Sequence, residues 1–300
     1  MKILFLGSPH FAAKVMQGVL DAGHTITTLI CKPDRPASRG KKISMPEAKE
    51  FAISQGIQVL QFENVNQHIE EIKKIDFDIF ITASFGQILS RQFLEIGLGL
   101  NVHPSMLPLL RGATPIQTAL LQNMTSTGVT IQRMRYEMDA GEILEQASLD
   151  IDPNDDYVSL EEKLALLAIE LLNSGLKKIE NNTYTFTPQK GQPTFTNMIT
   201  KEDGRLNFDK SAAENIGKVR ALAHNPGAYF DYVDGRVKVL KCALASDNIL
   251  YSAGEIIPNK NHFIIKCKEG SIEIISLISP SGKTMDGKSF LNGLRDVTRL

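Results

Sequence analysis

Tryptophan is absent from the 300 residues, and cysteine occurs only three times. Cys31, Cys242 and Cys267 are odd in number, lie far apart and match no CxxC or Cys/His ligand spacing. Such a set indicates neither a disulfide framework nor a structural zinc site. We therefore expect three reduced, buried thiols and no bound metal.

Long hydrophobic runs are also missing. The chain contains no stretch of about 18 uncharged apolar residues, the length that a membrane helix needs. Its first residues, MKILFLGSPHF, lack the basic region and the apolar length of a signal peptide. We expect a cytoplasmic protein with no membrane partner. A content of 42% hydrophobic and 22% charged residues is typical of a globular chain of about two domains.

A strong net charge of either sign is absent as well, because the formal value is -1. This argues against a protein that coats nucleic acid unspecifically. Residues 206–300 nevertheless hold 13 Lys and Arg against 10 Asp and Glu, so the last third is mildly basic. The stretch KPDRPASRGKKISMPEAK (32–49) adds six Lys or Arg in one long loop. It is either a solvated surface or, at the end of a parallel strand, a contact for the phosphates of a polyanionic substrate.

The first half of the chain alternates β-rich apolar runs with amphipathic segments. This order predicts a Rossmann-like, doubly wound, mostly parallel sheet with right-handed crossovers. In such sheets ligands bind beyond the carboxyl ends of the strands. Strands are expected at 2–7, 25–30, 58–60, 78–84 and 99–103, with helices at 11–21, 46–55, 64–74, after 84 and at 116–122.

The second half has a different texture. A strand at 128–134, a turn and an amphipathic helix at 159–180 complete the first part. Short segments rich in Thr, Pro and Lys then suit a linker, and short strands with an Asp-Gly hairpin signal at 234–235 predict a small β-barrel or sandwich. We predict a first domain over 1–188, a linker over 189–206 and a second domain over 207–300.

The motif GSPHFA (7–12) directly follows the first strand, at the position of a phosphate-binding turn. It is neither GxGxxG nor a Walker A sequence, and Pro9 removes one of the amides that a phosphate cradle uses. A tight strand-to-helix turn is the simplest interpretation. Nucleotide binding and a wall of another ligand's pocket stay open as alternatives.

The stretch NVHPSMLPLLRG (101–112) is the most informative one. Strand alternation puts Asn101 and His103 on the same face, and the prolines end the strand. Asp139 follows the next expected strand and should reach the same sheet edge. A hydrogen-bond donor for an oxyanion, an acid–base and an orienting carboxylate suit acyl transfer to an amine through a tetrahedral intermediate. A merely structural histidine is the simpler alternative.

Several motifs together closely resemble the methionyl-tRNA formyltransferases, over nearly the whole chain. They are NVHPSMLPLLRGATPI, the Asp139-Ala140-Gly141 turn, GSPHFA, PDRPASRGKK and SGKTMDGKSFLNG. Members of this family move a formyl group from 10-formyltetrahydrofolate to the amino group of methionine on initiator tRNA, for translation initiation. The resemblance implies a Rossmann-like catalytic domain followed by an OB-like β-barrel.

The resemblance also implies roles for single residues. Asn101 would bind the formyl oxygen, His103 would take part in proton transfer from the attacking amine, and Asp139 would hold His103. The remaining implied contacts form two sets. The folate would meet Ser105, Met106, Leu107, Pro108, Phe85, Gly86, Gln87, Ile88 and Leu89, and the tRNA would meet Arg35, Arg39, Lys41 and Lys42.

The chain departs from the family pattern at three places. Met106 stands where Leu is usual, Ser90 where Pro is usual, and His224-Asn225 where Pro-Trp is usual. Two competing functions stay open: formyl transfer to another acceptor, such as a nucleotide-sugar amine, glycinamide ribonucleotide or water, and a non-catalytic RNA-binding role. The basic loop and the basic second domain favour tRNA, and we expect a monomer.

Overall fold

The computed structural model describes residues 1–36, 43–223, 225–233 and 235–293, which fall into two compact units. Unit 1 consists of Met1–Pro115, Ser126–Asp150 and Glu161–Asn197, and unit 2 of Ile116–Thr125, Ile151–Leu160 and Met198–Leu300. The segment expected to be a linker, 189–206, divides between them, because residues up to 197 group with unit 1.

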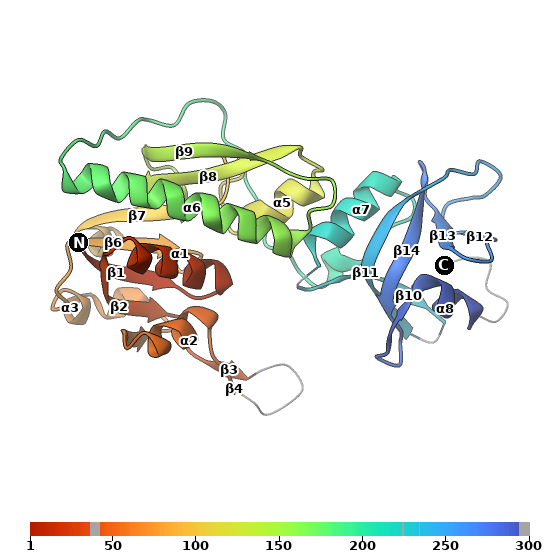
Figure 1. Cartoon of the computed structure of the whole chain (residues 1–300), viewed down its shortest axis with the longest axis horizontal. Helices are drawn as coiled ribbons and strands as arrows, with labels where there is room; N and C mark the ends of the chain where they lie inside the picture. The colour runs from red at the N-terminus through yellow and green to blue at the C-terminus, as the bar shows by residue number, and fades with distance from the viewer. Residues whose placement is uncertain (37–42, 224, 234, 294–300) are drawn as a thin grey trace. The chain divides into compact units, whose positions relative to one another are not determined.

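Unit 1 is built on a seven-stranded sheet of order β5-β2-β1-β6-β7-β8-β9 (Figure 1). The first five strands are parallel to one another, and β8 and β9 continue the sheet in antiparallel fashion. The predicted Rossmann-like, mostly parallel sheet is therefore confirmed. The strands are β1 (Lys2–Gly7), β2 (Thr25–Cys31), β5 (Gln58–Gln61), β6 (Ile79–Ala83), β7 (Leu98–His103), β8 (Ser126–Arg133) and β9 (Ile143–Asp150).

Helices cover both faces of this sheet. On one face α1 touches α6, since a Cβ added to Gly18 would lie 2.4 Å from Ile169. On the other face Leu4, Leu6 and Phe80 pack against α3 and α4, in agreement with strand alternation. The helices of unit 1 are α1 (His10–Asp21), α2 (Glu47–Ser54), η1 (Val65–Gln67), α3 (Ile69–Ile72), α4 (Arg91–Leu94) and most of α6 (Tyr157–Glu180). The short helix α5 (Pro115–Leu121) groups almost entirely with unit 2.

Two features of the sheet differ from the sequence analysis. The expected strand near 128–134 exists as β8, but it runs antiparallel to β7, so Arg133 at its end pairs with Leu100. The following strand β9 was missed, because its alternation is interrupted by polar residues. As a consequence, Asp139 does not arrive at the carboxyl edge of β7 along a parallel strand. The turn after β8 carries it back instead.

Unit 2 contains a curled antiparallel sheet of order β10-β11-β14-β13-β12, with β15 paired to β14. The helix α7 begins with a capping box between Ser211 and Glu214 and packs on β11. The sheet forms a half-barrel, and the predicted OB-like second domain is confirmed. Its elements are η2 (Glu202–Gly204), α7 (Ala212–Ala221), β10 (Ala228–Tyr232), β11 (Gly235–Ala245), β12 (Ile256–Ile257), β13 (Phe263–Lys266), β14 (Ser271–Ile278), β15 (Thr284–Asp286) and α8 (Gly287–Asn292).

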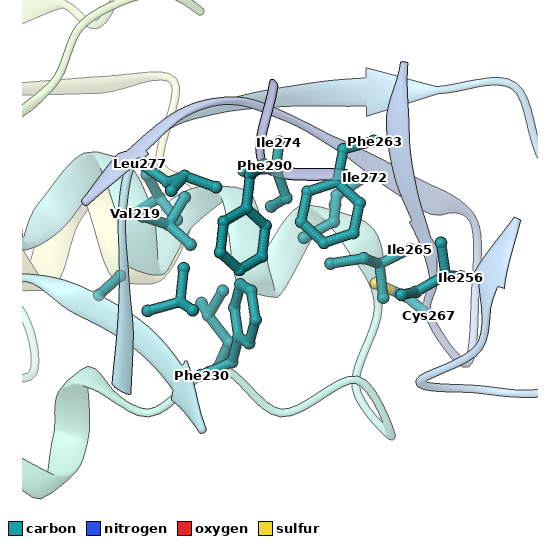
Figure 2. Close-up of a cluster of buried hydrophobic side chains, with 14 of the residues drawn as sticks. Val219, Phe230, Ile256, Phe263, Ile265, Cys267, Ile272, Ile274, Leu277 and Phe290 are labelled. Carbon is teal, nitrogen blue, oxygen red and sulfur yellow. The ribbon is translucent and has the colours of Figure 1, made fainter. Parts of the chain in front are cut away.

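Phenylalanine rings fill the centre of this half-barrel (Figure 2). The ring of Phe263 is fully buried, and its centroid lies 6.3 Å from that of Phe230 and 5.7 Å from that of Phe290. Aromatic pairs at such distances add about 0.5–1.5 kcal/mol to the gain from burial. Three phenylalanines thus give unit 2 an aromatic core in a chain without tryptophan.

A separate two-stranded ribbon, β3 (Arg35–Pro36) with β4 (Ile43–Ser44), flanks the basic loop. Within the described ranges, no helix combines the length and the apolar content that crossing a bilayer requires.

Cys31 and Cys267 are buried, as expected, whereas Cys242 is only half-buried, so the expectation of three buried thiols is wrong for Cys242. Burial raises the pKa of the Cys31 and Cys267 thiols to about 11 and that of Cys242 to about 12. Only the thiolate reacts with alkylating agents, and the unfolded thiol has a pKa of about 8.5. At pH 8 we expect iodoacetamide to label each native cysteine at least about a hundredfold more slowly than in the urea-unfolded chain. The native rate should keep rising as the pH increases toward 11. Fast native labelling at pH 8, read by mass spectrometry, would contradict this.

Candidate active site

Three polar side chains form a row across the middle of the sheet of unit 1. Asn101 on β7 pairs in register with Thr82 on the parallel strand β6 and with Gln132 on the antiparallel strand β8. Residues opposite one another on neighbouring strands point to the same face. Thr82 and Gln132 are only 4% and 2% exposed, so this row is a buried polar feature of the sheet.

The Thr82 hydroxyl fixes the orientation of the Asn101 amide. Thr82 Oγ1 donates a hydrogen bond of 2.7 Å to Asn101 Oδ1. The amide nitrogen Nδ2 therefore faces the other way, where it donates to Asp139 Oδ1 at 3.1 Å. An amide nitrogen carries two hydrogens, and among the described residues Asn101 Nδ2 donates only to Asp139, which leaves one N–H for a substrate oxygen.

The Asp139 carboxylate is the centre of the cluster. Its Oδ1 accepts from Asn101 Nδ2 and from Gln132 Nε2 at 3.0 Å, and its Oδ2 accepts from the backbone N–H of Gly112 at 2.8 Å. The side chain is 13% exposed. Burial of a carboxylate is costly unless N–H groups replace the lost water. These three donors meet that requirement.

The backbone of Asp139 has an unusual conformation. Its φ is +49°, in the left-handed region of backbone conformation that residues other than glycine rarely adopt. Such a residue costs about 1–3 kcal/mol and persists only where neighbouring contacts hold it. Gly141, two residues later, lies so close to β8 that an added Cβ would be 1.7 Å from the carbonyl oxygen of Arg133. The turn after β8 is therefore tightly seated against the strand.

His103 is 4% exposed at the end of β7. Its Nε2 lies 2.9 Å from the carbonyl oxygen of Leu110. A carbonyl only accepts, so Nε2 carries the hydrogen and the neutral ring has its lone pair on Nδ1. Asp139 Oδ1 lies 3.6 Å from Nδ1 and is the ion-pair partner of the protonated ring. Asn101, His103 and Asp139 thus come together, as the sequence analysis expected.

One member of the cluster was missed completely by the sequence analysis. Gln189 lies in the segment expected to be a linker, and its Nε2 donates to the carbonyl oxygens of Asp139 and Gly141, both at 2.8 Å. No local pattern around Gln189 indicates this contact. Thr82 had a weak signal, as a hydroxyl in the middle of the apolar run DIFITAS. Gln132 had the same kind of signal in GVTIQRM.

Within the described residues no three His, Cys, Asp or Glu side chains come close enough to share a metal ion. The chemistry of the cluster is that of an amide donor, an imidazole and a carboxylate.

Known protein families match both parts of the chain. Residues 1–176 match the model described as "Formyl transferase", and residues 198–295 match "Formyl transferase, C-terminal domain". This chain belongs to the formyl transferase family. It is therefore an enzyme, and the resemblance inferred from its motifs is confirmed.

Individual relatives are similar over almost their whole length. A methionyl-tRNA formyltransferase from Lactobacillus acidophilus is 36% identical over 297 residues, which cover 97% of this chain and 95% of the relative. One from Sulfurihydrogenibium sp. is 34% identical over 303 residues, covering 98% and 97%.

Solved structures more distant in sequence share the fold. An N-formyltransferase from Helicobacter canadensis, in complex with folinic acid and dTDP-3-aminofucose, has a TM-score of 0.68 at 21% identity and covers 91% of this chain and 98% of its own. HypX from Aquifex aeolicus, in complex with tetrahydrofolic acid, has a TM-score of 0.69 at 15% identity. That match covers 97% of this chain but only 47% of HypX.

The side chains expected to meet folate after β7 are mostly turned inward in this formyl transferase. Ser105 is fully buried, and its hydroxyl donates to the carbonyl oxygen of Leu109 at 2.6 Å. Leu107 is 3% exposed, and Pro108 is also buried. Met106 lies on the backbone of Gly128, where an added Cβ would be 2.5 Å from its sulfur. The role of these residues in folate binding stays a prediction.

The segment after β6 differs in exposure from residue to residue. Phe85 and Leu89 are each 4% exposed, whereas Ile88 is 77% exposed. Gly86 is exposed and has a φ of +68°. The Gln87 side chain donates to the carbonyl oxygen of Phe62 and accepts from the N–H of Val65. Ile88 and Gly86 are thus the members of this set that face solvent, and their role too stays a prediction.

Of the residues expected to meet tRNA, Arg35 lies on β3 with a 71% exposed side chain, 3.6 Å from Glu63. Arg39, Lys41 and Lys42 lie outside the described residues. The base of their loop is held by Lys49, which donates to Asp34 at 2.6 Å and lowers the pKa of that carboxyl.

The row across the sheet gives a direct test. In Thr82→Val the Asn101 amide loses the donor that orients it, so we expect kcat for formyl transfer to fall about tenfold. The free energy of unfolding should fall by about 1–2 kcal/mol. Thr127→Val is the matched control, because Thr127 is 3% exposed on β8 and its hydroxyl has no partner among the described residues. That variant should keep its kcat and be at least as stable as the wild type, because it removes a buried hydroxyl that has no partner. Equal rates for both variants would refute the orienting role of Thr82.

Proposed function

We propose that this enzyme transfers the formyl group of 10-formyltetrahydrofolate to the amino group of methionyl initiator tRNA. The observation that carries the proposal is the 36% identity, over 97% of the chain, to a relative named methionyl-tRNA formyltransferase. The cluster of Asn101, His103 and Asp139 supports it, because amide, imidazole and carboxylate match the needs of acyl transfer to an amine. Tetrahydrofolic acid in a structural neighbour is consistent with a folate donor.

In this reaction the neutral amine attacks the formyl carbon, and negative charge develops on the formyl oxygen. We assign the free N–H of Asn101 to that oxygen. Its orientation is preset by Thr82 and Asp139, so no reorganisation is needed when the charge appears. Preorganised donors of this kind contribute about 10²–10³ in rate.

The attacking nitrogen must lose a proton as the new C–N bond forms. Since Nε2 of His103 keeps its hydrogen on Leu110, proton exchange with the amine takes place at Nδ1. Asp139, 3.6 Å from that atom, then stabilises the positive ring. When the bond between the folate nitrogen and the formyl carbon breaks, His103 Nδ1 gives the proton to that folate nitrogen.

Two observations support tRNA as the acceptor: the positive charge of the basic loop (32–49) and of unit 2, and the identity to methionyl-tRNA formyltransferases. Cations of the basic loop and of unit 2 suit phosphates that position an RNA. We propose contacts from Arg35, Arg39, Lys41 and Lys42, a folate site formed by 85–89 and 105–108, and a monomer that works in the cytoplasm. The division into 1–188, 189–206 and 207–300 is part of the same proposal.

The first test is the choice of acceptor. We expect methionyl initiator tRNA to be formylated at least about a hundredfold faster, in kcat/KM, than a nucleotide-sugar amine.

The His103→Ala variant tests the mechanism. It should lose about tenfold to ten-thousandfold in turnover, with the Kd for tRNA held within about threefold, because the ring contacts the reacting atoms and not the RNA backbone. Faster transfer to the sugar amine would overturn the acceptor, and full activity of His103→Ala would overturn the mechanism.

The second test concerns the basic loop. Arg39→Ala should raise the KM for tRNA several-fold and leave the KM for folate unchanged, and the difference should shrink at higher salt because phosphate contacts are screened. Lys74→Ala is the control: it also removes one positive charge, but from an exposed position beyond α3. Steady-state kinetics at two salt concentrations separate the cases. If the KM for tRNA were the same in both variants, a contact between Arg39 and the tRNA would be excluded.

A further inference from the structure

Gln189 ties together two stretches that are far from it in sequence. Its Nε2 donates to the carbonyl oxygens of Asp139 and Gly141 at 2.8 Å each, and its Oε1 accepts from the Arg111 guanidinium at 2.6 Å. The amide is partly buried and lies in a segment without regular secondary structure. One side chain therefore links the turn after β8 to the loop after β7.

The direction of the Gln189 amide is fixed by chemistry. A guanidinium only donates hydrogen bonds, so the group facing Arg111 must be the oxygen. The nitrogen then points at two carbonyl oxygens, each of which only accepts. Both ends of the amide are thus matched to their partners.

The two carbonyl oxygens belong to the turn whose backbone is strained. Asp139 has a φ of +49°, and its carboxylate receives its donors from β7, β8 and Gly112. Those donors hold the end of the side chain, whereas the two short hydrogen bonds of Gln189 hold the main chain on both sides of Ala140. The third contact of its Nε2, to Gln132 Oε1, is longer at 3.4 Å. A side chain can be placed to a fraction of an ångström only when its backbone is also fixed.

We propose that Gln189 is a positioning residue that holds Asp139 in place against His103. The proposal rests on the formyl-transfer function given above and adds to it a residue from outside the Asn101, His103 and Asp139 set. Misplacement of a catalytic group by about 1 Å can cost about a hundredfold in rate. The loss should therefore appear in kcat and not in the binding of either substrate.

The segment that carries Gln189 has anchors of its own. Thr187 exchanges two backbone hydrogen bonds of 2.8 Å with Ile143 at the start of β9. Further along, Arg111 N–H donates to the carbonyl oxygen of Thr194 at 2.9 Å, and Thr196 N–H donates to that of Arg111 at 2.8 Å. These contacts are independent of the Gln189 side chain, so the segment stays attached when that side chain is changed.

The test is Gln189→Glu. Glutamate has the same shape and keeps its partner Arg111, but it offers no N–H, and its oxygen faces two carbonyl oxygens. We expect kcat to fall about tenfold to a hundredfold and KM for tRNA and folate to stay within about threefold. Gln192→Glu is the matched control, since Gln192 is exposed. It should stay within about twofold of wild type.

Amide hydrogen exchange, read by NMR, separates positioning from anchoring. The N–H of Gly112 is protected by Asp139 Oδ2, and that of the neighbouring Arg111 by Thr194. In Gln189→Glu, Gly112 should exchange at least about tenfold faster and Arg111 within about threefold. Equal acceleration of both would mean that Gln189 only anchors the segment, and no acceleration of either would also refute the proposal.

Failure of the variant to fold and failure of the proposed function can both be told apart from the results above. If Gln189→Glu does not fold, Gln189→Met, which has no donor, only a weakly accepting sulfur and no charge, is measured in the same way. If the wild-type enzyme and Gln192→Glu both fail to formylate methionyl-tRNA, the proposed function is wrong. The exchange of Gly112 and Arg111 still decides then whether Gln189 holds Asp139.

Discussion

Burying a carboxylate to 13% exposure is costly unless N–H groups replace the water that it loses, and the structure of unit 1 around Asp139 supplies those groups. Its donors come from β7, from β8 and from the loop after β7. Asn101 and Gln132 must therefore sit in register, the turn after β8 must fold back, and Gly112 must lie beside it. His103 Nδ1 lies 3.6 Å from the same oxygen, Asp139 Oδ1, so the donors that hold the carboxylate also place it beside the imidazole ring.

Much of this arrangement follows from local rules. The period of two in a strand puts Asn101 and His103 on one face, and the order of strands and helices predicts a mostly parallel sheet. Asp139 lies beside Asn101 and His103, but the direction of the strand before it was not part of the expectation. A helix between two strands usually connects parallel neighbours, and the sequence between β7 and β8 contains such a helix, α5. Strand direction depends on pairing across the sheet, which periodicity does not contain.

The residues that escaped the sequence analysis share a physical reason. The partners of Gln189 are 50 and 78 residues away, so no window around it carries the information. Thr82 and Gln132 act through their neighbours across strands, and only their polarity inside apolar runs marked them. Conversely, Ser105 looked available for a ligand, but its hydroxyl is used by Leu109 within its own loop. Motif position indicates where a residue lies and leaves open what its polar atoms contact.

The tie between Arg111 and Gln189 has a further consequence for the way the site is made. It closes a stretch of 78 residues, and closing a flexible loop of that length costs about 4 kcal/mol of chain entropy. The backbone hydrogen bonds of Arg111 with Thr194 and Thr196 close nearly the same stretch and share this cost. A chain growing from its amino end holds Asn101, His103 and Asp139 well before residue 189 exists. Completion of the site is therefore a late step, set by a glutamine fifty residues beyond the aspartate that it holds.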